Sequence, residues 1–302
     1  MKTVFVLGSL NMDLVMKTNV FPRPGETVHG EHFFTNPGGK GANQAVAVAR
    51  QGVPVVMLGA VGQDAYGEVL TSHLHDLGVD TSHVQRVKGS SGVAVILLHH
   101  HENRILLQRG ANDGLQMAPI QAYLQAQAKP GDYLLMQFEI PLAMVESMIP
   151  FAASLGLKII LNPAPAYAHF PKTLFASLDL LIPNEGEAAN LCGLPPETTK
   201  PETSARLLYE HGVKNVVITL GEEGCLHYNG ENTYFPAMKV RPVDTTAAGD
   251  AFVGALAAEL AKDVPLVEAI QWANRVAAVT VTKMGAQDSI PTRQEVEDFF
   301  PY

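Results

Sequence analysis

The sequence predicts an α/β protein: a three-layer α/β/α sandwich with a mostly parallel central sheet, plus a small β-sheet that stands apart as a lid. Short, continuously apolar runs alternate with helical patterns along most of the chain, which is typical of parallel strands covered on both faces. Two other segments alternate polar and apolar residues, which indicates antiparallel strands.

Six runs rich in β-branched residues are the expected strands of the central sheet: 3–9, 53–61, 131–137, 157–162, 178–183 and 214–221. Between them lie helical patterns such as GANQAVAVARQG, PLAMVESMIPFAASLG and EGEAANLCG. The last third of the chain is mostly helical, with AGDAFVGALAAELA, PLVEAIQWANRVAAVTVT and TRQEVEDFF. This order favours parallel βα units followed by a helical layer.

Residues 14–35 surround a Pro-Gly turn, and residues 90–109 read as two strands joined by a polar turn. We expect these two insertions to form the lid, and residues 1–13, 36–89 and 110–302 to form the α/β domain. A small sheet with one apolar face needs a cover. A partner subunit or a closed cleft would supply it.

Composition narrows the function classes. The 302 residues are 47% hydrophobic and 17% charged, as in ordinary soluble globular proteins. No run approaches the ~18 apolar residues of a membrane span. A net charge of −9 without a basic stripe excludes nucleic acid as the expected partner.

Only two cysteines, Cys192 and Cys225, are present, so we expect a reducing compartment, the cytoplasm. The HHH run at 99–101 suggests a metal site, but consecutive residues of a strand point to alternate faces, which favours a solvated turn.

The segment NPGGKGANQA (36–45) places glycines directly before a helix start, where backbone can approach a ligand. Lys40 and Asn43 are three residues apart and can share one side of the first turn. The alternative is a plain glycine-rich loop. The segment is not a P-loop, because the Ser or Thr that would hold magnesium is missing, and no strand-linked GxGxxG supports a dinucleotide-binding fold.

In GSLNMDLV (8–15), we expect Asn11 and Asp13 to end the first strand on one face, over the edge where α/β sheets bind ligands. Together they offer donors and acceptors for vicinal hydroxyls. The alternative is an Asx turn.

Two further strands end in candidate ligand groups. In LIPNEGEAA (181–189), Asn184 and Glu187 fall in the first turn of a helix, where simple capping is the alternative role. In TLGEEG (219–224), flexible backbone could lie along a nucleotide, although any tight turn gives a similar string.

In DTTAAGDAF (244–252), we expect Ala248, Gly249 and Asp250 to open a buried helix whose unpaired N–H groups form an anion site. A carboxylate beside such a site repels phosphate. It fits better as a general base that takes a proton from an attacking hydroxyl. The alternative is an aspartate that only favours the helix dipole.

Taken together, these motifs resemble the ribokinase family of ATP-dependent sugar kinases from about residue 4 to residue 300. GGKGANQA and DTTAAGDAF carry the resemblance most specifically. It implies a ribokinase-like α/β fold with a lid over the sugar, dimerisation through the lids, and ATP-dependent phosphorylation of D-ribose at O5, with D-ribose 5-phosphate as the product.

The resemblance also implies roles for individual residues. Asp250 would be the catalytic base, with the N–H groups of Ala247, Ala248 and Gly249 holding the γ-phosphate. The implied sugar contacts are Asn11, Asp13, Gly39, Lys40, Asn43, Glu139 and Asp250. The implied nucleotide contacts are Asn184, Thr219, Gly221, Gly224, Gly249 and Asn274. Glu187, with Asn184, would organise Mg²⁺, and a K⁺ site would use Asp244, Thr246, Thr280, Lys283, Gly285 and Ser289.

Other functions stay open. A 2-deoxyribokinase is the nearest alternative, but such sequences tend to lack the asparagine found here at Asn11. Other sugar or nucleoside kinases of the family, and a non-catalytic sugar sensor on the same fold, are further alternatives.

Overall fold

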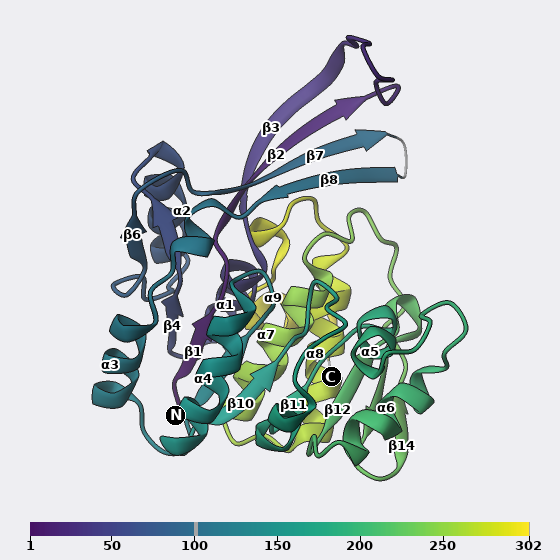
Figure 1. The fold of residues 1–302 in the computed structure, drawn as a ribbon. Coiled ribbons are helices and arrows are strands. Elements are labelled where there is room, and N and C mark those ends of the chain that lie inside the picture. Colours follow the sequence, from purple (N-terminus) through teal and green to yellow (C-terminus); the bar gives the residue numbers. More distant parts are fainter. Residues whose placement is uncertain (100–101, 302) are drawn as a thin grey trace.

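The central sheet of the computed structural model, which describes residues 1–99 and 102–301, has eight strands in the order β14-β13-β12-β11-β10-β9-β1-β4 (Figure 1). The strands from β4 to β12 in this order are parallel, and β13 and β14 are antiparallel additions at one edge. Their bounds are β1 (Val4–Leu7), β4 (Val55–Leu58), β9 (Tyr133–Met136), β10 (Lys158–Leu161), β11 (Leu180–Leu181), β12 (Val216–Thr219), β13 (Cys225–Tyr228) and β14 (Asn232–Phe235). Each of the six predicted strand runs contributes a strand to this sheet, although the end of run 53–61 belongs to β5 (Ala60–Gly62), a strand of a separate small sheet.

Two helical layers cover the sheet, so the predicted three-layer α/β/α sandwich is confirmed. In β1, Val4 and Val6 pack into one core cluster, whereas Phe5 and Leu7 pack into the other. The first layer contains α1 (Lys40–Arg50), α2 (Ala65–Asp76), α7 (Ala248–Ala261), α8 (Leu266–Thr280) and α9 (Arg293–Phe299); the second contains α3 (Met117–Gln127), α4 (Leu142–Ser154), α5 (Glu185–Cys192) and α6 (Pro201–Glu210).

A four-stranded sheet, here called the lid sheet, projects from the body in the order β3-β2-β7-β8 (Figure 1). It contains β2 (Asn11–Thr18), β3 (Gly30–Gly38), β7 (Gly92–His99) and β8 (Glu102–Gln108). The two hairpin pairings are antiparallel, as expected, and β2 and β7 join the hairpins in parallel. A short pair, β5 (Ala60–Gly62) and β6 (Gln85–Val87), lies at the base of the lid.

The expected position of Asn11 and Asp13 at the end of the first strand is wrong. β1 ends at Leu7, and both residues lie in β2, the first strand of the lid sheet. The chain changes direction between β1 and β2, where the backbone N–H of Leu10 donates a hydrogen bond to the Asn112 side chain. Both residues still share one face of a strand, and the division of the chain into two domains stays a prediction.

Two further sequence expectations concern the histidine run and the membrane. His99 ends β7, but His100 and His101 lie outside the described residues, so the predicted solvated turn stays a prediction. Within the described chain, no helix has the length and apolar character needed to span a bilayer.

Candidate active site

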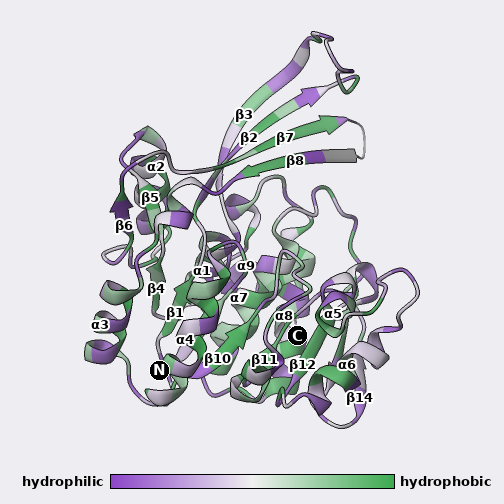
Figure 2. Ribbon diagram, in the orientation of Figure 1, coloured by the Kyte–Doolittle hydropathy of each residue, from purple (hydrophilic) through white to green (hydrophobic). Residues whose placement is uncertain are grey.

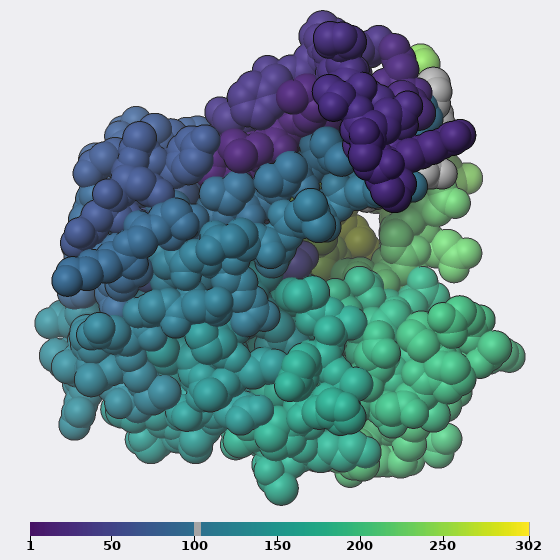
Figure 3. All heavy atoms as spheres, turned by 45° about the horizontal axis from the view of Figure 1, so that its top comes forward, coloured from purple at the N-terminus to yellow at the C-terminus, as the bar shows by residue number. Residues whose placement is uncertain are grey.

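One cleft lies at the carboxyl ends of β10, β11 and β12, beside the first turn of α7. Figure 3 shows the surface hollowed in the space between the lid sheet and the body. The cleft has a volume of about 150 Å³, and its lining residues come from both halves of the chain: Lys40, Asn162, Ala164, Ile182, Asn184, Glu187, Thr219, Thr245, Ala247, Ala248, Gly249, Asp250 and Val253. It therefore brings together eight of the residues predicted for the site.

The N-terminus of α7 faces this cleft. Ala247 precedes the helix in the left-handed region, with φ 59°. No side chain of the described residues caps the helix. A Cβ added to Gly249 would meet no atom within 4 Å, so the space beside this residue is open. The Ala248 N–H donates to the Thr245 carbonyl at 3.3 Å, but no side-chain cap from the described part of the chain covers this first turn. At the positive end of the helix dipole, such a turn is suited to an anion.

Asp250, in that first turn, is a buried carboxylate held by two amides of α1. Its Oδ2 accepts a hydrogen bond from Asn43 Nδ2, and its Oδ1 accepts one from Gln44 Nε2, both at 2.9 Å. Asn43 Oδ1 in turn accepts from Gln287 Nε2 at 3.2 Å. Both carboxylate oxygens are fixed, and each keeps a second lone pair for a hydroxyl group.

Glu139 links the start of the lid to the start of α1. Its Oε2 accepts from Ser9 Oγ at 2.6 Å, from the backbone N–H of Lys40 at 3.1 Å and from Asn11 Nδ2 at 3.3 Å. Asn11 Oδ1 accepts from Asn112 Nδ2 at 2.8 Å, so the orientation of the Asn11 amide is defined from both sides. Sequence chemistry alone gave no reason to select Glu139; only the resemblance did.

Asp13 and Lys40 are ionisable side chains near Asp250 whose pKa values are shifted. Burial, together with Glu139 and Asp250, raises the pKa of Asp13 to about 7. Nearby Asp250, then Glu139 and Glu187, raise the pKa of Lys40 against the opposing effect of burial. Lys40 thus stays charged and offsets the carboxylates around it.

Gly39 is required where the lid strand passes into α1. Its φ is 93°, and a Cβ there would lie 2.8 Å from the backbone nitrogen of Asn11 and 2.9 Å from the carbonyl oxygen of Ser9. Any side chain would push the β2 backbone away from α1. The glycine thus sets the distance between the lid strand and the helix that carries Lys40 and Asn43.

Asn184 and Glu187 form a capping box at the start of α5, so the structural alternative raised by the sequence is present. The Asn184 N–H donates to Glu187 Oε2, and the Glu187 N–H donates to Asn184 Oδ1, both at 2.8 Å. Burial raises the pKa of Glu187. Both residues also line the cleft, and the capping contact occupies only one of the two Glu187 oxygens.

Of the predicted nucleotide positions, Asn184, Thr219 and Gly249 line the cleft and Asn274 lines a second hollow, whereas Gly221 and Gly224 line neither. Thr219 lines the cleft, where its N–H donates to the Pro183 carbonyl. Gly224, with φ 104°, passes so close to Phe235 that a Cβ would lie 2.0 Å from its carbonyl oxygen, whereas Gly221 is in open space. Asn274 lines a second hollow of about 290 Å³ with Phe235, Pro236, Met238, Gln271 and Arg275.

The residues predicted for a monovalent cation lie on two segments that contact each other: one precedes α7, and the other runs from the last residue of α8 to Ser289. Asp244 Oδ1 accepts from the N–H and hydroxyl of Thr246, at 2.9 and 2.6 Å, and Oδ2 accepts from the Gly285 N–H at 3.1 Å. Thr280 and Ser289 are both fully buried. The Ser289 hydroxyl donates a hydrogen bond to the Ala286 carbonyl. The Lys283 ammonium points elsewhere, to Glu295 at 2.6 Å.

Several buried amides at the site were missed by sequence analysis, namely Gln44, Asn112, Gln137 and Asn162. Gln44, Gln137 and Asn162 each interrupt an otherwise apolar or small-residue run, as Gln44 does in GANQAVAVA, whereas Asn112 stands in the polar segment RGANDGLQ. A polar residue inside a buried run must find hydrogen-bond partners, and that signal could have found these three.

The fold and the cleft define the class: an α/β protein with a lid, whose helix N-terminus and buried carboxylate suit phosphoryl transfer to a hydroxyl group. The family model described as "pfkB family carbohydrate kinase" matches residues 1–293, and the chain belongs to this family.

Within this family, the chain is similar over nearly its full length to several individual proteins. The chain is 42% identical to a ribokinase of Schizosaccharomyces pombe, over 99% of this chain and 98% of that protein. It is 35% identical to a deoxyribokinase of Salmonella typhi, over 98% of both. Among solved structures, an Arabidopsis thaliana ribokinase complexed with ribose and ATP superposes with a TM-score of 0.91 and 29% identity, covering 100% of this chain and 99% of that one.

Proposed function

We propose that this protein catalyses the ATP-dependent phosphorylation of D-ribose at O5, releasing ADP and D-ribose 5-phosphate. The observation that carries the proposal is Asp250, a buried carboxylate in the uncapped first turn of α7, at the edge of a cleft beneath a lid sheet. The Arabidopsis relative that binds ribose and ATP has the same fold over the whole chain.

In this reaction Asp250 takes the proton of the sugar hydroxyl as that oxygen attacks the γ-phosphorus of ATP. The N–H groups of Ala247, Ala248 and Gly249 stabilise the charge that develops on the transferred phosphoryl group. Asn11, Asp13, Asn43 and Glu139 bind the sugar hydroxyls. Lys40, whose pKa is raised, stays protonated and lowers the electrostatic cost of bringing phosphate near these carboxylates.

The donor sets near the cleft fit two cations. Mg²⁺ is held by few carboxylates together with water and phosphate oxygens. Glu187 supplies one such carboxylate, and the ion would neutralise phosphate charge. The Asp244 carboxylate and the adjoining loop at Gly285 suit a K⁺ ion beside the anion site, with Thr246, Thr280, Lys283 and Ser289 contributing mainly through backbone carbonyls.

The enzyme is further proposed to be a homodimer joined through its lid sheets, which expose apolar side chains such as Phe33 and Leu106. Its expected location in the cytoplasm stays a prediction that rests on the two unpaired cysteines.

The test measures ADP release with ATP and Mg²⁺, comparing ribose with 2-deoxyribose, each with K⁺ or with only a large organic cation. We expect K⁺-stimulated turnover with preference for ribose, because a site that hydrogen-bonds a hydroxyl through Asn11 disfavours the analogue that lacks it. Asp250→Asn should lower kcat by roughly 10²–10⁴-fold, the usual contribution of a general base.

The other outcomes separate the alternatives. Preference for 2-deoxyribose would keep the mechanism and overturn the role given to Asn11. Turnover independent of K⁺ would remove the cation site. A folded protein that binds ATP but phosphorylates no sugar in a wider panel would be a sensor.

A further inference from the structure

Gln44, the residue after Asn43 in α1, is fully buried and uses all of its hydrogen-bonding groups within the site. Its Nε2 donates to Asp250 Oδ1 at 2.9 Å and to Asn162 Oδ1 at 3.0 Å. Its Oε1 accepts from Gln137 Nε2 at 2.6 Å. The side chain thus connects the first turn of α7 with residues that follow β9 and β10.

The orientation of this amide is imposed by its neighbours. Asn162 donates its Nδ2 to the Ile182 carbonyl at 2.7 Å, so only its Oδ1 is turned toward Gln44. An ionised Asp250 can only accept hydrogen bonds. Gln44 must therefore present its nitrogen to both partners, and a flipped amide would place oxygen against oxygen twice.

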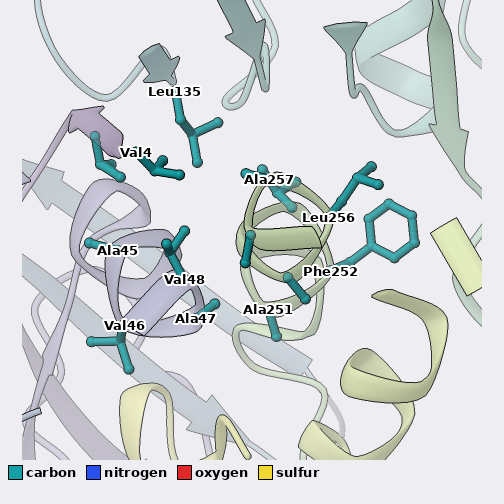
Figure 4. Close-up of a cluster of buried hydrophobic side chains, with 14 of the residues drawn as sticks. Val4, Ala45, Val46, Ala47, Val48, Leu135, Ala251, Phe252, Leu256 and Ala257 are labelled. Carbon is teal, nitrogen blue, oxygen red and sulfur yellow. The ribbon is translucent and has the colours of Figure 1, made fainter. Parts of the chain in front are cut away.

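The backbone of α1 is also held against α7 at this point. A Cβ on Gly254 would lie 2.5 Å from the Gln44 carbonyl oxygen and 2.5 Å from the Ala47 Cβ. Figure 4 shows the two helices packed side by side through Ala45–Val48 and Ala251–Ala257. Gly254 lies one helical turn after Asp250 on α7, and it permits this close approach. Gln44 is therefore packed against α7 close to Asp250, with little freedom to move.

We propose that Gln44 is a positioning residue for the Asp250 carboxylate: it fixes Oδ1, so that the carboxylate cannot rotate about its last side-chain bond and the remaining lone pairs face the substrate. Asn43 holds the other oxygen, but it also takes part in sugar binding, whereas Gln44 is shielded from the substrate. The inference rests on the proposed function, because it assigns a support to the proposed base.

The test is the substitution Gln44→Met, which keeps length and apolar volume but removes the amide. We expect kcat with ribose and ATP to fall on the order of 10- to 100-fold, as small misplacements of a catalytic group do, with KM values changed less than about threefold. In the Asp250→Asn background the same substitution should lower kcat no further, because no base is left to position.

The matched control is Gln51→Met, at the other end of α1. Gln51 is equally buried, accepts from Trp272 Nε1 and donates to the Pro291 carbonyl, both at 3.0 Å, and lies away from the cleft. The Gln51→Met substitution should lower the urea midpoint of unfolding and leave kcat unchanged. If Gln44→Met does not fold, Gln137→Met removes only the bond to Gln44 Oε1 and should lower kcat in the same direction by less.

Two results would overturn the inference: an unchanged kcat in a folded Gln44→Met protein, or an equal loss of kcat in the wild-type and Asp250→Asn backgrounds. A wild-type protein without turnover would instead contradict the proposed function. The contact is then tested by unfolding in urea, where Gln44→Met should lower the midpoint of the wild type more than that of Asp250→Ala, which leaves no side-chain acceptor for Gln44 Nε2 at position 250. Equal shifts would reject the contact itself.

Discussion

At the scale of single residues, Asp13 couples the site to pH. Burial, Glu139 and Asp250 raise its pKa from 3.8 to about 7. The folded protein therefore keeps a proton on Asp13 that the unfolded chain has released, so the free energy of unfolding falls as pH rises from about 4 to about 7. Asp13→Asn cannot ionise and should gain stability relative to the wild type between pH 5 and 8, by about 1–2 kcal/mol given partial hydration.

Urea unfolding at several pH values measures this difference, and Asp64→Asn is its control. Burial opposes ionisation of Asp64, but hydrogen bonds from Ser91 and Gly67 outweigh it and lower its pKa. The stability that Asp64 contributes is present above its unfolded pKa and lost only at lower pH, so its variant should differ from the wild type by a constant amount from pH 5 to 8. A constant difference for Asp13→Asn as well would refute the shifted pKa.

At the scale of elements, one buried amide joins the lid to the body. Asn112 lies in a short 3₁₀ helix (Gly110–Gly114) after β8. Its Oδ1 accepts from the Leu10 N–H at 3.0 Å, and its Nδ2 donates to Asn11 Oδ1 and to the carbonyls of Leu10 and Arg109. The start of β2 and the segment that follows β8 are thus joined by hydrogen bonds at Asn11.

Asn112→Leu should therefore lower the free energy of unfolding by about 1–3 kcal/mol, since it leaves buried backbone groups of Leu10 unpaired. It should also raise KM for ribose, because the Asn11 amide loses the partner that orients it. The control is Asn19→Leu, at an exposed position near the lid tip, with an expected change within about 0.5 kcal/mol. Chemical denaturation and steady-state kinetics give both values. A lower stability with unchanged KM would mean that Asn11 does not need this support.

The sequence predicted the strands and helices of the sandwich, but it did not predict the turn that leads into the lid or two of the buried amides. The strands and helices of the sandwich follow from periodicity, because each buried strand and α7 carry their apolar residues in continuous runs. The turn at Gly8–Leu10 has no such signal, so Asn11 and Asp13 were assigned to the wrong strand. Gln44 and Asn112 were missed for another reason: their roles depend on partners about 100 to 200 residues away in sequence, which local pattern does not encode.

At the scale of the whole molecule, the lid sheet has two distinct faces. Asn11 and Asp13 lie on the face toward the cleft. The register pairs Leu106 with Val95, Val95 with Leu14, and in the next row Leu97 with Met16 and Met16 with Phe33. Because side chains alternate along a strand, these residues share the opposite face. Figure 2 shows that β7 is hydrophobic along most of its length and that β8 is hydrophobic toward its C-terminal end.

This opposite face is where a second subunit would pack. Leu106 is 72% exposed and Phe33 60% exposed, although each is paired with an apolar residue of the adjacent strand on this face, Val95 and Met16 respectively. We expect sedimentation velocity at micromolar concentration to detect a dimer, and Leu106→Lys to weaken dimerisation at least about tenfold by placing an unpaired charge in the interface. Val267→Lys, at a 47% exposed position of α8, should leave the dimer unchanged. A monomeric wild type, or equal behaviour of the two variants, would rule out dimerisation through this face, and the lid would then serve the cleft alone.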